Sequence, residues 1–398
     1  MGEWKQCKLK DICKTNASSY SSKDNYSFVN YLDTGNITQN IIDEVQFIDI
    51  EKDKLPSRAK RKVKYNSILY STVRPNQLHY GIIKEQPENF LVSTGFTVID
   101  VDEKMADADF IYYYLTQYEV TESMQSIGEQ STSAYPSIKA SDLEDLDICL
   151  PTLEEQKKIA SFLKSLDAKI TMNSDINNNL AEQSQAILKK YMDDFEYTLT
   201  PLGEIANIID CLHSKKPDMV DNTTKQLLQL NNITDTGFLD LSSKYYISET
   251  DYENWTRKCE IVEGDCVITN VGRIGAVSQA PFGTHAAMGR NMTCIRLKHN
   301  KPYYSFLITA LLSNHIRREI MKNTDEGTIM GALNVKNIPL LQFPIFSTDV
   351  MNTLEESLYP IRKSIEHNYL ANQKLSDLRD TLLPKLMSGI IELSSVSI

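Results

Sequence analysis

Apolar residues recur at alternating steps of four and three along residues 152–192, and the pattern returns near the end of the chain. Such steps place side chains on one stripe of a helix, and a stripe kept over several turns needs a matching partner. Asn173 and Asn177 interrupt the first stripe, and Asn368 and Asn372 interrupt the second at corresponding positions. A polar residue in such a seam costs stability but fixes register and partner. We therefore expect two long helices that pair with each other.

The two stripes correspond residue by residue, because each position of the second is numbered 195 higher than its counterpart. Residues 152 to about 192 are expected to form the first helix, roughly 60 Å long at about 1.5 Å per residue. Pro360 and Pro384 predict that the second helix kinks or starts near residue 360 and ends by about 383. The positions expected to pair the helices are Leu163, Leu166, Ile170, Asn173, Asn177, Leu180, Leu358, Ile361, Ile365, Asn368, Asn372 and Leu375.

Strand-like and short helical runs alternate in the stretches that precede the helices. We expect strands at 68–72, 96–101, 266–268 and 293–297, and single helices at 110–121 and 303–321. The sequence thus predicts two α+β domains, at 1–150 and 196–344, each followed by a helical segment, at 151–195 and 345–398. The two copies are offset by 195 residues, which exceeds the roughly 20 to 50 residues of the repeats in stacked arrays. The offset therefore indicates a duplicated unit of one domain and one helix.

Three loops recur in the same order in both domains. The first follows a strand and contains Arg74 or Arg273, the second spans 93–96 or 288–291, and the third spans 128–137 or 325–334. Long ordered loops on a rigid scaffold commonly carry binding specificity. We expect the binding residues of each domain to lie in these loops.

Charge is distributed unevenly along the chain. The net charge of -11 argues against a nucleic-acid partner. However, residues 51–65 hold seven Lys or Arg against two acidic residues, whereas residues 141–167 hold seven acidic residues against three Lys. This distribution fits a DNA-facing domain on a protein-facing scaffold, and a solvated surface loop is the alternative for the basic run. The second domain has fewer basic candidates, chiefly Lys215-Lys216, Arg257-Lys258, Arg273 and Arg290.

The composition is that of an ordinary globular protein of 398 residues, 41% hydrophobic and 24% charged. No run approaches the roughly 18 apolar residues of a membrane span and no signal pattern opens the chain, so a cytoplasmic location is expected. The seven cysteines include no C-x-x-C pair, which favours reduced, packed thiols over zinc ligands. Motifs for nucleotide binding, zinc proteases, serine hydrolases and amino-methyltransferases are missing. No catalytic residue, cofactor or metal ligand is therefore expected on this chain.

One segment carries an explicit family resemblance. Leu150–Ile159 contains a leucine-proline step followed by Glu-Glu-Gln, and Leu166–Ile170 continues the helix with Leu-Asp. These ranges resemble the central helical region of the DNA specificity subunit of type I restriction-modification systems. The resemblance covers the whole chain, because that family has two target recognition domains alternating with two such helices. The second copy lacks Glu-Glu-Gln and has Phe346–Asp349 instead, but Leu382–Gly389 is a typical ending.

The resemblance implies an α+β fold in which two pseudo-symmetric recognition domains are separated by two long helices, paired as an antiparallel coiled coil. Each domain would read one half of an asymmetric, split site in double-stranded DNA, and the helices would set the half-site spacing and dock two methyltransferase subunits. Those partners would methylate adenine N6 with S-adenosylmethionine. Two restriction subunits, where the system has them, would use ATP and Mg2+. This chain itself would be non-catalytic.

Loop chemistry indicates which residues would contact DNA. Arg, Asn, Gln and His side chains can reach base edges, whereas basic side chains of the 51–65 run would contact phosphates. The expected base contacts are Arg74, Asn76, Gln77, His79, Asn270, Arg273, Arg290 and Asn291. The expected phosphate contacts are Lys60, Arg61, Lys62 and Lys64. On the helices, Glu154, Lys158 and Asp167 are expected to face the methyltransferase.

Two other classes of protein remain open. A pseudo-symmetric scaffold that binds proteins would show no salt-dependent DNA binding in any complex. An enzyme of DNA processing would cleave or modify DNA as the purified chain, and Glu155-Gln156-Lys157 with an upstream Asp matches a nuclease pattern only loosely. Neither class explains the duplicated asparagine-bearing stripes as simply. The target sequence itself cannot be read from side-chain identity.

Overall fold

The computed structural model describes residues 4–130, 136–234, 237–298, 303–325 and 331–393. The chain divides into two compact units, one made of residues 1–168 and 375–398 and the other of residues 169–374. The division falls inside both long helices. Each unit therefore contains one domain together with a part of each long helix.

The first unit is built around two four-stranded sheets, with strand orders β6-β3-β10-β7 and β2-β11-β8-β9. All four residues of β8 are buried, as its apolar sequence Ile-Leu-Tyr-Ser predicts. The strands are β1 (Lys5–Lys8), β2 (Cys13–Thr15), β3 (Phe28–Leu32), β4 (Ile37–Thr38), β5 (Ile41–Ile42), β6 (Gln46–Asp49), β7 (Ala59–Lys62), β8 (Ile68–Ser71), β9 (Tyr80–Ile82), β10 (Phe90–Ser93), β11 (Phe96–Val101) and β12 (Asp147–Leu150). The helices are α1 (Leu9–Ile12), α2 (Ala108–Leu115), α3 (Tyr118–Glu129) and α4 (Ala140–Glu144), with 3-10 turns η1 (Ser22–Asp24), η2 (Thr34–Asn36) and η3 (Pro75–Gln77).

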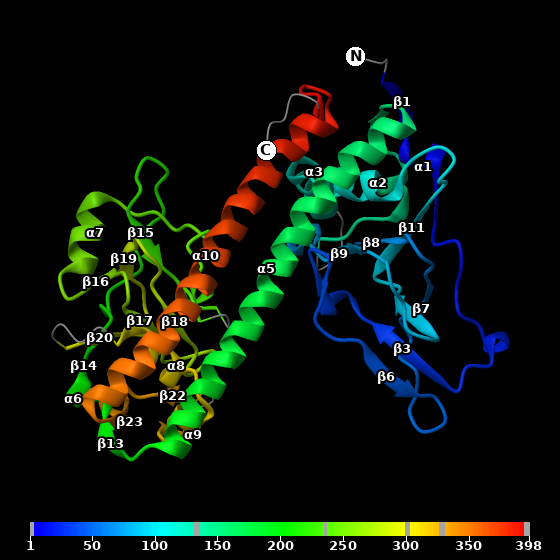
Figure 1. Ribbon diagram of the computed structural model, residues 1–398. Helices are drawn as coiled ribbons and strands as arrows, with labels where there is room; N and C mark the ends of the chain where they lie inside the picture. The colour runs from blue at the N-terminus through cyan, green and yellow to red at the C-terminus, as the bar shows by residue number, and fades with distance from the viewer. Residues whose placement is uncertain (1–3, 131–135, 235–236, 299–302, 326–330, 394–398) are drawn as a thin grey trace. The chain divides into compact units, whose positions relative to one another are not determined.

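The second unit repeats this topology (Figure 1). Its sheets have strand orders β14-β20-β17-β18 and β15-β19-β16. The strands are β13 (Tyr197–Pro201), β14 (Ala206–Asp210), β15 (Gln226–Leu228), β16 (Glu260–Val262), β17 (Cys266–Thr269), β18 (Val277–Gln279), β19 (His285–Met288), β20 (Met292–Leu297), β21 (Thr324–Asp325), β22 (Ala332–Leu333) and β23 (Gln342–Phe346). The helices are α6 (Leu202–Ile205), α7 (Glu249–Thr256), α8 (Tyr304–Leu311) and α9 (Asn314–Lys322), with 3-10 turns η4 (Leu230–Asn232) and η5 (Val335–Leu340).

Strand pairing confirms the duplication. In the first unit β10 pairs in parallel with β3 and antiparallel with β7, and in the second β19 pairs in parallel with β15 and antiparallel with β16. The antiparallel series β2-β11-β8-β9 likewise corresponds to β14-β20-β17-β18. Two independent sheets with the same mixed pattern show that the two domains share one fold.

The long helices are α5 (Leu153–Asp194) and α10 (Thr348–Met387). The predicted bounds of α5 are confirmed within two residues, and the Thr152 hydroxyl accepts a hydrogen bond from Glu155 N (3.3 Å) at its start. The sequence predicts that the second helix kinks or starts near residue 360 and ends by about 383; a start near 360 and the end by 383 are wrong, because α10 runs from Thr348 to Met387. Pro360 lies inside α10, where proline costs about 3 kcal/mol. The helix nevertheless continues through Pro360, and the neighbouring Leu358 is buried, at 1% exposure.

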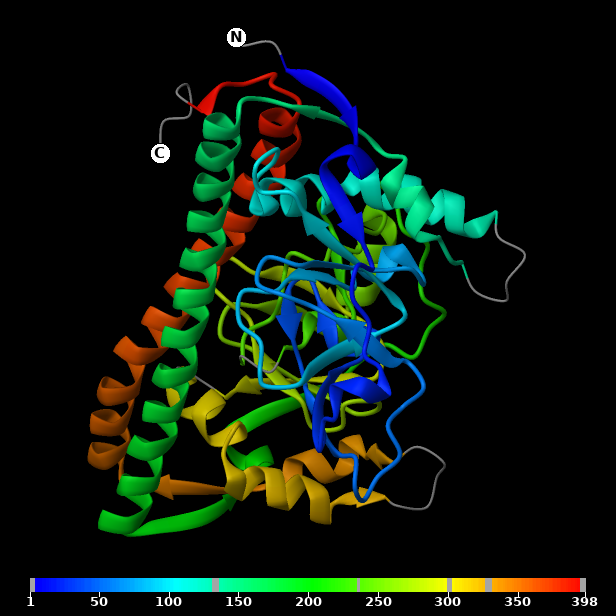
Figure 2. The same cartoon turned by 90° about the vertical axis from the view of Figure 1, so that its right-hand side faces the viewer.

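Within each unit the segments of α5 and α10 run side by side and antiparallel (Figure 2). In the second unit the side-chain amide of Asn173 donates to Asn372 Oδ1 (2.8 Å), and that of Asn368 donates to Asn177 Oδ1 (2.9 Å). In the first unit Arg379 Nη1 lies 2.7 Å from Asp167 Oδ1. All twelve stripe positions expected to pair the helices are buried or half-buried. The asparagine register therefore defines how the two helices face each other.

The short helices expected at 110–121 and 303–321 are each two helices, α2 with α3 and α8 with α9. The second break arises because the Ser313 hydroxyl accepts a hydrogen bond from Ile316 N (3.3 Å) and so caps α9. Each of the long helices α5 and α10 also accepts a backbone hydrogen bond at the start of a short helix, α2 in the first domain and α8 in the second. The Gln156 amide oxygen accepts Asp107 N (2.9 Å) before α2, and the Glu355 carboxylate accepts Phe306 N (2.8 Å) in α8.

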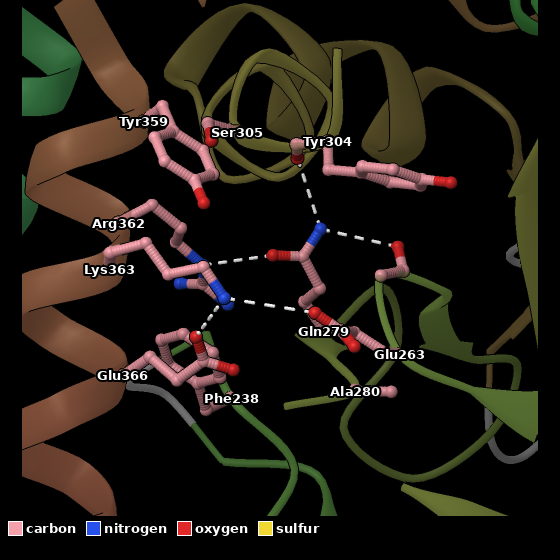
Figure 3. A pocket seen from close by; sticks show the side chains of 11 residues that line it. Phe238, Glu263, Gln279, Ala280, Tyr304, Ser305, Tyr359, Arg362, Lys363 and Glu366 are labelled. Carbon is pink, nitrogen blue, oxygen red and sulfur yellow. Dashed lines mark hydrogen bonds and ion pairs between the residues drawn. The ribbon is translucent and has the colours of Figure 1, made fainter. Parts of the chain in front are cut away.

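A pocket of about 330 Å³ lies in the second unit between α10, the start of α8 and the strand β18 (Figure 3). Arg362 on α10 points into the domain and donates through Nε to Gln279 Oε1 (2.9 Å). The amide of Gln279 in turn donates to Tyr304 O (3.0 Å). These bonds connect α10 to β18 and α8, which lie far from α10 in the sequence.

Candidate nucleic-acid interface

The three predicted loops of the first domain meet at Thr72, directly after β8. Thr72 N donates to Gly95 O (2.8 Å) in the second loop, and Thr72 O accepts Ile138 N (2.8 Å) just past the third. Residues 131–135 of that third loop lie outside the described residues. The strand end therefore brings together segments that are more than 60 residues apart in the sequence.

The second domain has the same junction at Asn270, directly after β17. Asn270 N donates to Asn291 O (2.9 Å), and Asn270 O accepts Leu333 N (2.9 Å). Residues 326–330 of the third loop lie outside the described residues. Both domains therefore build one loop cluster, with the same backbone hydrogen bonds, at the end of the corresponding strand.

In the first domain the loop cluster presents Asn76 and Gln77, whose side chains are exposed, on the turn η3. Arg74 and Leu78 flank this turn with φ of 48° and 57°. Such left-handed backbone is costly for side chains other than glycine, so the surroundings must hold the turn in place. One of these contacts is the bond from Arg74 N to Pro136 O (2.9 Å). The turn is therefore a fixed platform for polar side chains.

Three of the four expected phosphate contacts, Lys60, Arg61 and Lys62, lie on the sheet-edge strand β7. Lys60 is exposed and Lys64 is 64% exposed, with its Nζ 4.0 Å from Asp100 Oδ1. Lys62 instead forms an ion pair with Asp24, and this hydrogen bond lowers the pKa of the Asp24 carboxyl and raises that of Lys62. Arg61 is half-buried, and its Nε is buried without a hydrogen-bond partner. Among the four expected phosphate contacts, Lys60 and Lys64 are thus the ones with exposed side chains, and Lys54 and Arg58 of the same run are exposed as well.

In the second domain Arg290 and Asn291 are exposed on the turn between β19 and β20. They line a pocket of about 310 Å³ together with Lys216, Gln229, Asn231 and Trp255. Asn291 has φ of 63°, so the turn is held in a conformation that most side chains avoid. Arg273 is exposed on the neighbouring loop and donates through Nη1 to Ile233 O (2.9 Å). Polar and basic groups therefore converge at this loop cluster.

Two expected base contacts have their polar groups engaged inside their own domain. Asn270 is only 7% exposed, its amide donates to Leu333 O (3.1 Å), and its oxygen accepts the Thr293 hydroxyl (3.0 Å). His79 is half-buried, with Nδ1 2.6 Å from Ile37 O. The expectation of base contact is corrected for Asn270, whose buried amide holds the loop cluster together.

Sequence reasoning did not find Gln229, Asn231 and Trp255 of the second-domain pocket. Trp255 comes from α7 and the two amide residues from the segment after β15, so only tertiary packing brings them beside Arg290. In the sequence, Lys216 is only one of several basic residues of the second domain. In the structure its Nζ lies 3.6 Å from the Tyr245 ring centroid. No local pattern marks these residues as neighbours.

Among the expected helix-surface contacts, Asp167 is occupied inside the first unit. Its carboxylate accepts the Tyr113 hydroxyl (2.6 Å) and Arg379 Nη1 (2.7 Å). Its expected role at a partner surface is therefore replaced by a structural role. Glu154 and Lys158 remain exposed, at 80% and 64% of their side chains, and pair with each other at 2.6 Å.

The seven cysteines are all free, and four of them are buried. Two groups of metal-ligating side chains occur among the described residues, Asp210 with Cys211 and His213, and Cys259 with Asp265 and Cys294. In the second group the Arg296 guanidinium donates to both oxygens of Asp265 (2.7 and 2.6 Å). A fixed cation thus already neutralises that carboxylate. Among the described residues no helix is both long and apolar enough to cross a membrane.

Comparisons with known proteins agree with these features. Residues 1–182 match the family described as type I restriction modification DNA specificity domain. The chain is 23% identical to the type I restriction enzyme HindI specificity subunit of Haemophilus influenzae, over 98% of this chain and all of that protein. It is 22% identical to the putative type I restriction enzyme MjaX specificity subunit of Methanocaldococcus jannaschii, over 99% of this chain and 95% of that protein.

The fold is also similar to a solved structure. The crystal structure of the type I restriction-modification system S subunit from M. genitalium superposes with a TM-score of 0.54 at 15% sequence identity, over 97% of this chain and 96% of that one. Both the domain-helix alternation and the full-length coverage agree with the family expected from Leu150–Ile159. Residues 1–182 thus match the DNA specificity domain of type I restriction-modification systems, and the whole chain is similar to specificity subunits of type I restriction enzymes.

Proposed function

We propose that this chain is the sequence-reading, non-catalytic subunit of a type I restriction-modification complex. Residues 1–150 and 196–344 are the two recognition domains, and 151–195 and 345–398 are the helical spacers. Each domain reads one half of a split, asymmetric site in double-stranded DNA. The observation that carries this proposal is the pair of equivalent loop clusters at Thr72 and Asn270, which present different polar side chains on the same fold.

Base reading is proposed for five exposed loop residues and the half-buried Arg74. Arginine can bind guanine with two hydrogen bonds and asparagine or glutamine can do the same with adenine, which gives each cluster the chemistry to distinguish base pairs. The residues proposed for base contact are Arg74, Asn76, Gln77, Arg273, Arg290 and Asn291. Lys60 and Lys64 are proposed for phosphate contact, because they present charge at the edge of the first domain.

The partners proposed for this chain are two methyltransferase subunits and, where the system has them, two restriction subunits. The methyltransferases supply S-adenosylmethionine chemistry, and the restriction subunits use ATP and Mg2+, so this chain needs no cofactor of its own. The exposed part of α5 around Glu154 and Lys158 is proposed as one docking surface. The complex is proposed to act in the cytoplasm.

Methylome sequencing tests this function directly. Cells would express this chain with its neighbouring methyltransferase, and control cells would express the methyltransferase alone. We expect a split, asymmetric motif that is methylated only when both proteins are present. A stable complex that methylates no such motif, and binds DNA without sequence preference, would contradict the proposal and favour a protein-binding scaffold.

A further inference from the structure

Arg362 and Tyr369, which lie two turns apart on α10, both contact the ring of Phe238 in the second domain. The guanidinium carbon of Arg362 lies 3.2 Å from the centroid of the Phe238 ring. The Tyr369 ring also stacks on Phe238, with centroids 5.8 Å apart and planes at 12°. Phe238 is 2% exposed. A buried side chain of the domain thus contacts two side chains of the helix, and Figure 3 shows Phe238 beside Arg362.

Hydrogen bonds from the same two helix residues fix the backbone around Phe238. Arg362 Nη2 donates to Gly237 O (2.7 Å). The Tyr369 hydroxyl donates to Leu239 O (2.8 Å) and accepts Leu241 N (3.3 Å). Because these bonds end on main-chain atoms, they set the position of the segment 237–241 itself. We call this set of contacts from Arg362 and Tyr369 the α10 clamp.

The clamped segment leads to the loop that carries Arg273. Leu239 forms a β-bridge with Ile233, and Ile233 O accepts the hydrogen bond from Arg273 Nη1 (2.9 Å). Arg273 and Arg362 also line the same groove, of about 740 Å³. A short series of direct contacts therefore runs from α10 through Leu239 and Ile233 to the Arg273 guanidinium.

The chemistry of Arg362 exceeds what packing alone requires. Burial lowers the pKa of Arg362 to about 9, so the group is still charged at neutral pH. The acceptors of its two hydrogen bonds, Gly237 O and Gln279 Oε1, are uncharged. Burying a charge without a directly bonded counter-ion is costly, whereas an apolar side chain of similar length would fill the space at lower cost. An apolar residue could fill the same space, but it could not donate the hydrogen bonds that position Gly237 and Gln279.

We infer that Arg362 and Tyr369 are positioning residues for DNA reading, which hold the segment 237–241 and through it orient Arg273. This inference rests on the proposed function. The positions numbered 195 lower are Asp167 and Ser174, and Asp167 is bonded to Tyr113 and Arg379. Ser174 donates its hydroxyl to Ile170 O (2.9 Å), so among the described contacts neither position makes a clamp like that of Arg362 and Tyr369. The effect of the α10 clamp is therefore confined to the half-site that the second domain reads.

The test uses Arg362→Met in the complete complex with its methyltransferase. Methylation rates are measured on duplexes that carry each single base change in either half-site. We expect discrimination against wrong bases in the second domain's half-site to fall by roughly tenfold, within the range that one bidentate contact supplies. Discrimination in the other half-site should stay unchanged. Lys363→Met is the matched control, because this neighbour on α10 pairs with Glu366 (2.7 Å) and makes none of the clamp contacts.

Tyr369→Phe gives a second, milder test, because it removes one hydroxyl and keeps the stacked ring. It should reduce discrimination in the same half-site by a smaller factor, and it carries the test if Arg362→Met does not assemble. Unchanged discrimination in the assembled variants would overturn the inference. Equal losses in both half-sites would overturn it too, since they indicate a general loss of structure. If the proposed function itself fails, the wild-type complex will already show no base discrimination.

Discussion

Residues with the same side chain have different prospects for DNA contact, because tertiary environment decides what each polar group can reach. Asn270 and Asn291 belong to adjacent loops and are joined by a backbone hydrogen bond. The buried side-chain amide of Asn270 is hydrogen-bonded to Leu333 and Thr293, whereas Asn291 is exposed beside Arg290 in a pocket. Exposure at a turn, and not residue type, therefore separates the residue proposed for base reading from the structural one.

A pair of substitutions distinguishes base reading from phosphate contact. Arg290→Ala should weaken binding to the cognate site by about 1 to 3 kcal/mol and relax the preference at one position, because it removes a base-edge contact. Lys60→Ala should weaken all sequences alike and reduce the salt dependence by about one ion, because it removes a phosphate contact. Binding isotherms of the methyltransferase complex at several salt concentrations measure both. Equal loss on cognate and random DNA for Arg290→Ala would remove that residue from the reading set.

Glu355 should make the stability of the second unit depend on pH. Its carboxylate accepts Ser305 N (3.0 Å) and Phe306 N (2.8 Å), but burial is the larger effect and raises its pKa. Since the folded state then binds the proton more tightly than the unfolded state, the free energy of unfolding falls as pH rises from the ordinary glutamate pKa through the raised one. Glu355→Gln removes this titration. Urea unfolding of both proteins between about pH 4 and 7 should give curves that diverge, and parallel curves would contradict the assignment.

At the scale of elements, the paired helices combine apolar packing with a small polar network. Asn177 donates to Ile365 O (3.2 Å) and accepts from Asn368, while Asn372 donates to Ile170 O (3.1 Å) and accepts from Asn173. Each of these amides finds its partners only in this antiparallel register. A shift of one turn along the helix would bury the same groups without partners, which costs about 1 to 3 kcal/mol for each. The network therefore specifies register.

A double-mutant cycle measures this contribution. Asn177→Leu alone leaves the Asn368 amide without its acceptor and should cost about 1 to 3 kcal/mol of unfolding free energy, and Asn368→Leu should cost a similar amount. The double variant should cost less than the sum of the two, because the second change removes a group that was already without a partner. Urea midpoints of the second-unit transition give the values. Strictly additive losses would show that the two amides act independently.

Sequence periodicity was sufficient to predict elements that depend on a local pattern. It was not sufficient to predict features that depend on tertiary contacts. The α5 stripe, the strand β11 and the asparagine positions all follow from spacing alone. Pro360 misled the prediction of where α10 begins, because the helix continues through the proline from Thr348 to Met387. The pocket around Arg290 was equally inaccessible, since Trp255 and Gln229 reach it through the fold and not through spacing.

At the scale of the molecule, the two units share a topology but differ in how each domain is attached to the helices. The first domain is attached through Tyr113 and Asp167, and the second through Glu355 and the α10 clamp. The two domains thus share one scaffold, while their loops and their attachments to the helices differ, as the proposed reading of two different half-sites requires. The two halves of a DNA site should therefore be separable by exchange of one domain.

Exchange of residues 1–150 for the corresponding stretch of another specificity subunit tests this separation. The exchange ends at β12, before the helical residues of α5, so the asparagine seam and the second loop cluster stay intact. We expect methylation of a hybrid motif, in which one half changes while the other half and the spacing between them are retained. Replacing residues 1–150 by a relative with the same first half-site is the control, and it should leave the motif unchanged. If the exchange alters both halves or the spacing, then the domains do not read independently, and the helices alone do not define the distance between them.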